Sequence, residues 1–212
     1  MLYLAPMVIK TATYVISSPD VKMCPPPDKP EFAFIGRSNV GKSSLINMLS
    51  DNQKLAKTSS TPGKTQLINH FVVNHQWYLV DLPGYGFAKV SQSARNRWQQ
   101  MIEHYLKERP NLVTIFVLVD GRHGPQKIDL EFLETLKRWQ VPFCVLFTKA
   151  DKESQRVVSQ NVKDFFQAMR KTWQFLPQYF VSSAEKKLGR EKILDYIEQK
   201  MKEFLEDQAG KG

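Results

Sequence analysis

The stretch Gly-Arg-Ser-Asn-Val-Gly-Lys-Ser at residues 36–43 constrains the fold more than any other part of this chain. Its spacing is G-x-x-x-x-G-K-[ST]. It follows an apolar run at 31–35, typical of a buried strand, and precedes residues 44–49, typical of the first turns of a helix. Glycines let the backbone turn so tightly that successive N–H groups point at phosphate oxygens, with the positive end of the helix dipole behind them. The sequence therefore predicts a phosphate-binding loop rather than an ordinary glycine-containing turn.

The side chains of this loop have separate predicted roles. Lys42 is expected to contact the β and γ phosphates as a point charge and to contribute to catalysis, and the Ser43 hydroxyl is expected to bind Mg²⁺. The residues that we predict to bind the nucleotide here are Gly36, Arg37, Ser38, Asn39, Val40, Gly41, Lys42, Ser43 and Ser44.

The remaining sequence is expected to fold around this loop as one domain. Its 212 residues, 42% of them hydrophobic, suffice for a substantial core. Apolar runs alternate with segments of helical period, which predicts an α/β fold: a three-layer sandwich with a mainly parallel sheet, one antiparallel edge strand and helices on both faces. We expect residues 1–30 to contribute a strand and a proline-rich linker to the same domain, 31–206 to form its body, and 207–212 to be a flexible tail.

The sequence shows no sign of a membrane or of an oxidising compartment. The apolar runs are too short to cross a bilayer, and the first residues lack the features of an export signal. The two cysteines, Cys24 and Cys144, have no metal-ligand spacing and suggest no disulfide framework. We therefore expect a cytoplasmic protein without a membrane partner.

A second motif, Asp81-Leu82-Pro83-Gly84, follows the strand pair predicted at 67–73 and 76–80, which we expect to be a hairpin at the edge of the sheet. Alone, D-x-P-G is a common turn. Behind a strand and after a phosphate-binding loop, the Asp81 carboxylate can hold Mg²⁺ through a water molecule, and Gly84 can bring a backbone N–H close to the γ-phosphate.

A third motif, Thr148-Lys149-Ala150-Asp151, predicts which base is bound. Guanine presents two adjacent donors that one ionised carboxylate can accept together, whereas adenine places an acceptor there, so Asp151 favours guanine and makes an ATPase or kinase unlikely. The Lys149 stem would pack on the ring. The run Ser182-Ser183-Ala184 would supply backbone N–H groups to the guanine carbonyl, and Val181 before it is also a predicted nucleotide contact; taken alone, Ser-Ser-Ala is more typical of a helix cap.

The charge of the chain indicates a polyanionic partner or, alternatively, an ordinary solvated basic face. The net charge is +9, from 30 Lys and Arg against 21 Asp and Glu. Between residues 52 and 97 one acidic residue, Asp81, stands among several basic ones. The basic residues of this segment are Lys54, Lys57, Lys64, Lys89, Arg95 and Arg97.

Together the motifs at 36–47, 61–66 and 81–86 resemble the EngB (YihA/YsxC) family of bacterial GTPases, within the translation-factor-related superclass of P-loop GTPases. The resemblance runs from about Thr13 to Phe204. It implies a P-loop NTPase fold like that of small G proteins and a Mg²⁺-dependent cytosolic GTPase that binds GTP and GDP. It also implies a partner, the large ribosomal subunit with its rRNA and proteins, whose maturation the GTPase assists, and a need for it in growth and division. We expect a monomer.

The resemblance also assigns a switch threonine. Thr65 would bind Mg²⁺ beside Ser43 in the GTP state, with Thr58 and Thr61 as nearby competitors. When the γ-phosphate is lost, this loop should relax. The predicted nucleotide contacts of the segment are Gly63, Lys64, Thr65, Gln66 and Leu67.

Catalysis is expected to be slow without help. After Gly84, where many GTPases carry a water-orienting glutamine, this chain has Tyr85, which cannot do that work. The predicted catalytic residues are Lys42, Thr65, Gly84 and Asn39. Asn39 could hold an activating K⁺, as in potassium-stimulated relatives, or it could be a turn residue that tolerates unusual φ and ψ. A group donated by a ribosomal partner is the other remedy.

Two other functions stay open on the sequence alone. A septin-like scaffold would polymerise on GTP and seldom hydrolyse it. A division protein would act on division directly, with ribosomal effects secondary.

Overall fold

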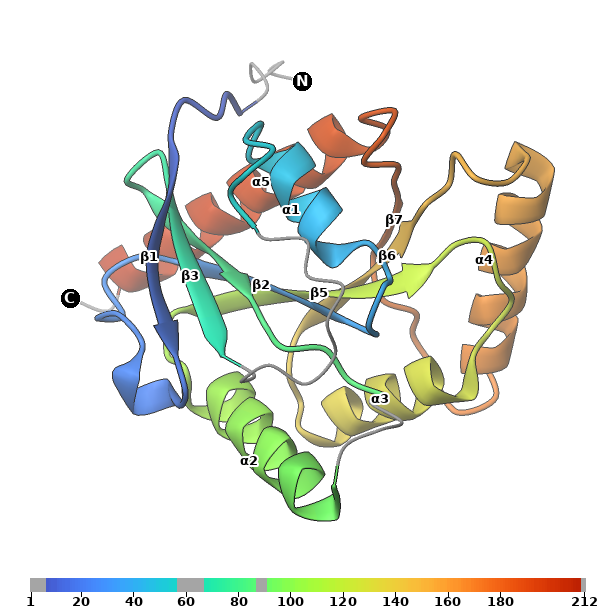
Figure 1. The fold of residues 1–212 in the computed structure, drawn as a ribbon, viewed down its shortest axis with the longest axis horizontal. Helices are drawn as coiled ribbons and strands as arrows, with labels where there is room; N and C mark the ends of the chain where they lie inside the picture. Colours follow the sequence, from blue (N-terminus) through green and yellow to red (C-terminus); the bar gives the residue numbers. More distant parts are fainter. Residues whose placement is uncertain (1–6, 57–66, 87–90, 211–212) are drawn as a thin grey trace.

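The computed structural model describes residues 7–56, 67–86 and 91–210. Within these residues, seven strands form one sheet in the order β1-β3-β4-β2-β5-β6-β7 (Figure 1). The strands are β1 (Ala12–Ser18), β2 (Glu31–Gly36), β3 (Ile68–Val73), β4 (Trp77–Asp81), β5 (Leu112–Asp120), β6 (Phe143–Thr148) and β7 (Tyr179–Val181).

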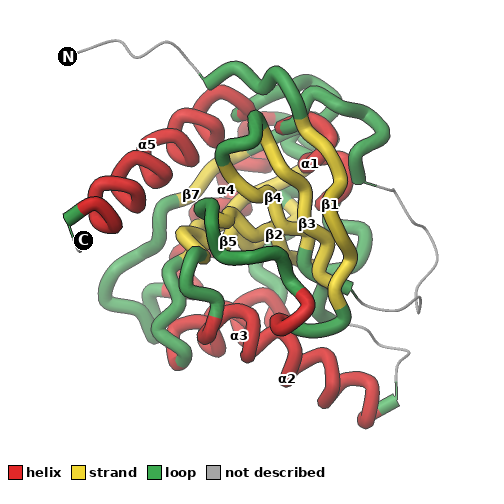
Figure 2. The backbone as a smooth tube through the Cα atoms, turned by 90° about the vertical axis from the view of Figure 1, so that its left-hand side faces the viewer, coloured by secondary structure: helices red, strands yellow, loops and turns green. Residues whose placement is uncertain are grey.

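Helices cover both faces of the sheet. Helices α1 and α5 pack on one face, and α2, α3 and α4 pack on the other (Figures 1 and 2). The predicted three-layer α/β sandwich is therefore confirmed. The helices are η1 (Val21–Met23, a 3₁₀ turn), α1 (Lys42–Leu49), α2 (Gln92–Glu108), α3 (Lys127–Arg138), α4 (Gln155–Met169) and α5 (Arg190–Ala209).

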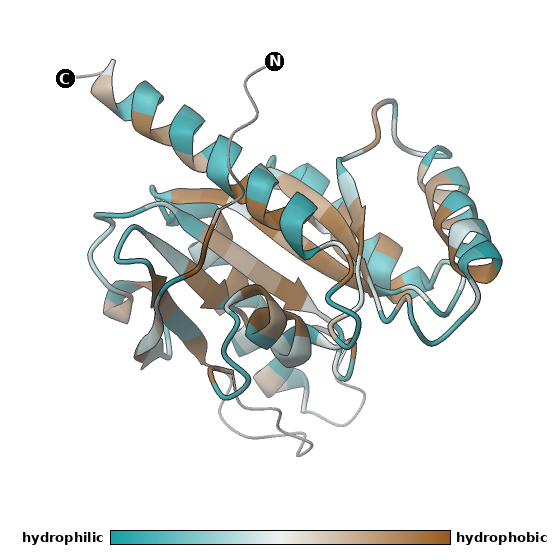
Figure 3. Ribbon diagram, turned by 90° about the horizontal axis from the view of Figure 1, so that it is seen from above, coloured by the Kyte–Doolittle hydropathy of each residue, from teal (hydrophilic) through white to brown (hydrophobic). Residues whose placement is uncertain are grey.

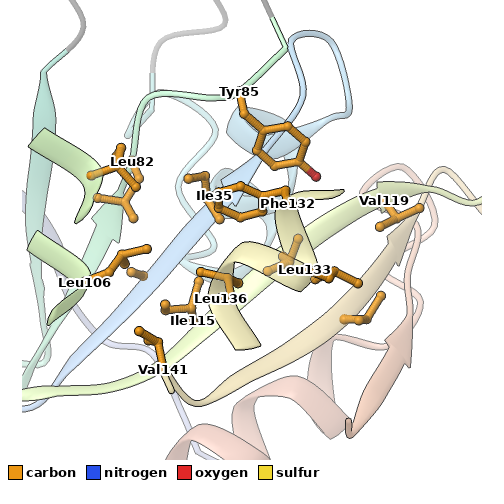
Figure 4. Close-up of a cluster of buried hydrophobic side chains, with 14 of the residues drawn as sticks. Ile35, Leu82, Tyr85, Leu106, Ile115, Val119, Phe132, Leu133, Leu136 and Val141 are labelled. Carbon is orange, nitrogen blue, oxygen red and sulfur yellow. The ribbon is translucent and has the colours of Figure 1, made fainter. Parts of the chain in front are cut away.

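The central strand β2 shows why its sequence is apolar after Glu31. All six of its residues are buried, because both faces of the sheet are covered there. Phe32 and Phe34 point into the core formed with α1 and α5, whereas Ala33 and Ile35 point into the core formed with α2, α3 and α4. Figure 4 shows the second core around Ile35, and Figure 3 shows the apolar central strands behind the more polar outer surface of α5.

One strand, β3, runs antiparallel to the others, but it does not form the edge of the sheet. It pairs with β4 through the predicted hairpin, in which Asn74 and His75 both adopt left-handed backbone angles. On its other side it pairs with β1, which is the true edge strand. The Asn74 side chain accepts hydrogen bonds from the N–H groups of Lys10 (2.7 Å) and Thr11 (3.1 Å) and so fixes the start of β1 beside the turn.

A buried ionic cluster joins the start of β2 to the end of α2. The Glu31 carboxylate accepts hydrogen bonds from Arg109 (2.6 Å from Nη2) and from the Tyr105 hydroxyl (2.7 Å), and His70 Nε2 lies 3.3 Å from it. Burial alone would raise the pKa of Glu31, but the contacts with His70 and Arg109 outweigh it and lower this pKa to about 2. Glu31 is therefore ionised inside the protein.

No helix within the described residues combines the length and the apolar character that a membrane span needs. The strands β2, β4, β5, β6 and β7 end on one side of the sheet, as parallel strands do. Crevices at the carboxyl ends of such strands are where α/β sheets bind ligands.

Candidate nucleotide-binding site

The predicted phosphate-binding loop lies between the end of β2 and the start of α1. Gly41 precedes the helix with a φ of 100°, and Asn39 has a φ of 62°, so both use left-handed backbone angles. At Gly36 a Cβ would lie 2.9 Å from atoms of Leu118 and Val40, which leaves no room for a side chain. The glycines of the motif are thus needed by the turn and by its packing against β5.

The charged side chains of the first two motifs meet at this loop. Lys42, in the first turn of α1, forms an ion pair with the carboxylate of Asp81, the last residue of β4. The two side chains are 16% and 13% exposed. The ammonium group predicted for the phosphates and the carboxylate predicted for the metal therefore lie side by side, within reach of the loop. Ser43 and Asp81 offer hard oxygen donors, which fit Mg²⁺.

The segment after β4 packs directly against the phosphate-binding loop. The Tyr85 N–H donates to the carbonyl oxygen of Gly36 (3.3 Å), in a short parallel bridge between Arg37 and Tyr85. A Cβ at Gly84 would lie 2.4 Å from the same Gly36 oxygen, so only glycine allows this approach. The backbone of Gly84 is therefore held next to the loop that would surround the phosphates.

The Tyr85 side chain is buried on the side of α3. Its ring stacks on Phe132 with centroids 4.3 Å apart (Figure 4). Its hydroxyl donates to Asp129 (2.8 Å), and Arg37 Nε also donates to Asp129 (3.0 Å). Burial raises the pKa of Asp129 despite these partners. The tyrosine therefore ties the segment after Gly84 to α3, which agrees with the expectation that it does not orient water.

A cavity of about 210 Å³ lies beside the loop, where the base-recognition motif was predicted. It is lined by Gly41 and Ser44 of the first motif, by residues of the third motif including Asp151, and by Ser182 and Ala184. Residues from the ends of α1, β6 and β7 thus meet around one space. Its lining also includes Lys152 and Glu185, which the sequence did not single out and which form an ion pair with each other.

The base motif is bonded to the phosphate-binding loop. Lys149 Nζ donates to the Asn39 carbonyl oxygen (2.6 Å), and the Thr148 hydroxyl donates to the Val40 carbonyl oxygen (2.6 Å). Lys149 Nζ also lies 3.0 Å from Asp120, whose other partner is Arg122. Burial alone would raise the pKa of Asp120, but hydrogen bonds from Arg122 and Lys149 outweigh it and lower this pKa. Sequence reasoning missed Asp120, although an acidic residue that ends a buried strand is a usable signal.

Asp151 is held in its ionised form at the edge of the cavity. The Ser183 hydroxyl donates to its carboxylate (2.5 Å), and this bond is the main reason that the pKa of Asp151 is lowered. The carboxylate can therefore accept two donors from a guanine ring. The sequence predicted backbone contacts from Ser183, but not this side-chain role.

Two of the predicted backbone donors are already used inside the protein. The N–H of Ser182 donates to Phe147 O (2.7 Å), and that of Ser183 donates to Leu188 O (3.2 Å). The first bond continues the pairing of β7 with β6, and the second closes the turn that joins β7 to α5. The residue types alone do not reveal either bond. Of the three donors, only the N–H of Ala184 has no backbone partner within the described residues, so it is the one still suited to the guanine carbonyl.

Several predicted contacts lie outside the described residues: Thr58, Thr61, Gly63, Lys64, Thr65 and Gln66. Of that segment, Leu67 is described and stands directly before β3. The basic residues Lys57 and Lys89 are also outside the described ranges, whereas Lys54, Arg95 and Arg97 are exposed on the surface.

Comparisons with known proteins agree with this geometry. A family model described as 50S ribosome-binding GTPase matches residues 31–149. The probable GTP-binding protein EngB of Christiangramia forsetii is 54% identical over 192 residues, which cover 91% of this chain and 97% of the relative. Its counterpart in Bacteroides thetaiotaomicron is 52% identical over 201 residues, or 95% of this chain and 100% of the relative.

Solved structures share the fold. A probable GTP-binding protein EngB superposes with a TM-score of 0.61 and 25% identity over 82% of this chain and 99% of its own. A variant of Era from Aquifex aeolicus superposes with a TM-score of 0.63 and 21% identity over 81% of this chain and 56% of its own, which shows a likeness of fold.

The sheet, the loop and the base cavity together define a P-loop GTPase, an enzyme that binds GTP and converts it to GDP and phosphate. The relatives named EngB are 52–55% identical to this chain over nearly its whole length, which is enough to assign a family within the P-loop GTPases. The chain belongs to the EngB family.

Proposed function

We propose that this GTPase is a nucleotide-gated assembly factor for the large ribosomal subunit, acting in the cytoplasm as a monomer and needed for normal growth and division. Its family model is described as 50S ribosome binding, and the net charge of +9 suits a partner rich in RNA. The remaining support comes from the connection between the GTP site and a basic helix, α2.

One contact carries this proposal. The indole Nε1–H of Trp98, on α2, donates to the carbonyl oxygen of Pro83 (3.1 Å), one residue before Gly84. The exposed Arg95 and Arg97 stand on the same helix within one turn of Trp98. A γ-phosphate that attracts the Gly84 N–H would move Pro83, and α2 with its cations would follow. GTP would thereby change the affinity of a basic surface for rRNA.

The proposed roles in hydrolysis follow from the positions of the side chains. Lys42 would neutralise charge on the β and γ phosphates, and the Gly84 N–H would bind the γ-phosphate. Mg²⁺ would be held by Ser43, by Asp81 through water and, in the GTP state, by Thr65; when bound, it would neutralise charge that develops on the phosphates. Asp151 and the Ala184 N–H would recognise guanine, and Lys149 would pack on the ring.

Hydrolysis would be slow unless a cation or a partner assists it, because Tyr85 is engaged with α3. We infer that K⁺ held by Asn39 is one such aid. The alternative role of Asn39 is that of a plain turn residue, which its left-handed φ of 62° would also serve. Turnover measured in KCl and in NaCl distinguishes them, since equal rates would remove the role of K⁺.

Sedimentation through a sucrose gradient tests the main proposal. With a non-hydrolysable GTP analogue the protein should travel with the large subunit, with GDP it should remain near the top, and added salt should remove it from the subunit. Equal distribution with both nucleotides would contradict gating. Polymers that form on GTP without ribosomes would instead favour a septin-like scaffold, and normal subunit profiles in depleted cells that fail to divide would favour a direct role in division.

A further inference from the structure

A groove lies along the outer edge of β7, the last strand of the sheet. Its volume is about 1400 Å³, and it is bounded by α4 on one side and by the segment that leads into α5 on the other (Figure 1). Apart from Ala150 and Val181, none of the residues that line it was assigned to the nucleotide site above. The groove is therefore separate from the proposed GTP site, and any ligand that it binds would differ from GTP.

The floor of the groove is an open strand edge. On the side of β6, the carbonyl oxygen of Gln178 accepts from Val145 (3.0 Å) and the N–H of Ser182 donates to Phe147 (2.7 Å). In a parallel ladder alternate residues face the same neighbour, so the backbone groups of Tyr179 and Val181 point to the other side. Within the described residues no strand pairs with that side.

Not every group on this edge is available. A Cβ at Gly189 would lie 2.4 Å from the Val181 carbonyl oxygen, which shows that the chain already packs over that oxygen. The N–H and C=O of Tyr179 and the N–H of Val181 remain. These are the donors and acceptor that one added β-strand needs.

The walls of the groove suit an extended peptide. The side chains of Tyr179 and Leu188, 46% and 51% exposed, stand at the groove, and the buried Val158 and Val162 of α4 lie beneath one wall. A strand laid between an open edge and a helix places alternate side chains against such apolar surfaces. Backbone bonds would supply affinity, and the apolar walls would supply specificity.

The lysine side chains of the groove indicate that its ligand is negatively charged. Lys163, Lys186 and Lys192 line it, are exposed, and form no ion pair with any described residue. Glu191 is the acidic residue in the lining, and Arg190 is engaged elsewhere, since its guanidinium donates to carbonyl oxygens at the end of α1. Two copies of this chain would bring like charges together, so an acidic partner is favoured over a second copy.

We propose that the groove beside β7 binds an extended acidic segment of another protein, which joins the sheet as an added strand. A single-stranded nucleic acid could meet the same lysines, but it would leave the open N–H groups of Tyr179 and Val181 without partners of strand geometry. The backbone edge therefore decides in favour of a peptide.

The test uses the full-length protein with GDP bound. A random library of linear twelve-residue peptides displayed on phage is selected against it, and the selected peptides are measured by fluorescence anisotropy. We expect sequences in which Asp or Glu alternates with apolar residues. Tyr179→Pro should weaken their binding about tenfold or more, because proline removes the outward N–H while it leaves the bonds to β6 in place.

The matched control is Tyr179→Val, which removes the same ring but keeps the N–H and should bind within about threefold of the unaltered protein. Unchanged GDP affinity shows that both variants fold. The triple change Lys163→Glu, Lys186→Glu and Lys192→Glu should also abolish peptide binding, whereas a triple reversal elsewhere, at Lys22, Lys127 and Lys171, should not.

Three results would overturn the proposal. The first is a selection that yields no acidic peptide. The second is equal binding of the selected peptides to Tyr179→Pro and Tyr179→Val. The third is a single-stranded RNA of twelve nucleotides that binds through the three groove lysines while no selected peptide depends on the Tyr179 N–H, which would make the groove a nucleic-acid site.

Discussion

At the scale of single residues, the proposed recognition of guanine depends on one carboxylate and on the hydroxyl that holds it. Asp151 lines the base cavity, and the Ser183 hydroxyl keeps its pKa low, so the acceptor remains charged at neutral pH. Guanine offers that acceptor two donors, whereas xanthine offers a carbonyl oxygen in place of the amino group.

Asp151→Asn should therefore exchange the base preference. An amide offers one donor and one acceptor, which match xanthine, so GDP affinity should fall by about a hundredfold and XDP affinity should rise. Titration calorimetry with both nucleotides measures the change. Asp195→Asn, an exposed change on α5, is the control and should leave both affinities unaltered. Retention of full GDP affinity by Asp151→Asn would contradict the assignment.

Asp120 should affect nucleotide binding indirectly, through Lys149, because its carboxylate lies 3.0 Å from Lys149 Nζ. Asp120→Asn removes the charge that holds this ammonium group against the Asn39 carbonyl, so GDP should dissociate about tenfold faster. Stopped-flow measurements with a fluorescent GDP analogue give the rate. Arg122→Met removes the other partner of Asp120 and keeps the bond to Lys149, so its rate should stay near that of the unaltered protein; equal acceleration in both variants would mean a general structural defect.

At the scale of elements, side-chain hydrogen bonds attach α2 to other segments at two places, one within the helix and one directly after it. Trp98 bonds it to the segment before Gly84, and Arg109, directly after the helix, bonds it to Glu31 at the start of β2. The helix is thus fixed at the end remote from the nucleotide, and within the described residues the hydrogen bond of Trp98 links it to the nucleotide segment.

Trp98→Phe should separate nucleotide binding from its readout. The ring is largely kept while the bond to the Pro83 carbonyl oxygen is lost, so GTP affinity should change less than about threefold. The difference between GTP-state and GDP-state binding to the large subunit should shrink. Co-sedimentation in both states measures it, and an undiminished difference would remove Trp98 from the proposed route. Trp139→Phe, directly after α3, is the control.

The Glu31 cluster should make stability depend on pH in acid. The folded pKa of Glu31 is about 2 against an ordinary value of 4.5, so the unfolded chain binds its proton first and stability is lost as the pH falls from about 4.5 towards 2. Glu31→Gln leaves Arg109 buried without its counter-charge and should cost about 3–5 kcal/mol at neutral pH. Urea unfolding across this pH range measures both effects, and the variant should show a shallower loss in acid.

The double change Glu31→Gln and Arg109→Met removes both charges together. It should recover part of the stability lost in Glu31→Gln, because no unpaired buried charge remains. A double variant that is less stable by the full sum of the two single changes would show that the two residues do not act as a pair.

At the scale of the whole molecule, a nucleotide that bridges loops from β2, β4, β6 and β7 should stabilise the entire sheet. GDP with Mg²⁺ at a hundred times its Kd should add about 2.7 kcal/mol and raise Tm by about 5–10 °C. Differential scanning fluorimetry with GDP and with ADP tests this. ADP should give no shift at the same concentration, and an equal shift with ADP would contradict the guanine site.

The sequence was sufficient to predict the sandwich, the phosphate-binding loop and the places of Asp81 and Asp151, because each of these rests on a short run of residues with its own chemistry. It could not place β1 outside β3, since that pairing depends on bonds between Asn74 and the chain before β1, some 64 residues away. Nor could it foresee that the amides of Ser182 and Ser183 are used internally, or that Asp120 holds Lys149. Such contacts depend on tertiary structure rather than on local pattern.

The guanidinium of Arg190 donates to the carbonyl oxygens of Met48 and Leu49, at the end of the helix that follows the phosphate-binding loop. Arg190 lies far along the sequence from the first motif, and the chain is made from its N-terminus. A chain that emerges during translation thus exposes its first motif long before the residues that complete the site have been made. The nascent protein therefore cannot hold GTP in a finished and braced site until the base-recognition residues and Arg190 have been synthesised.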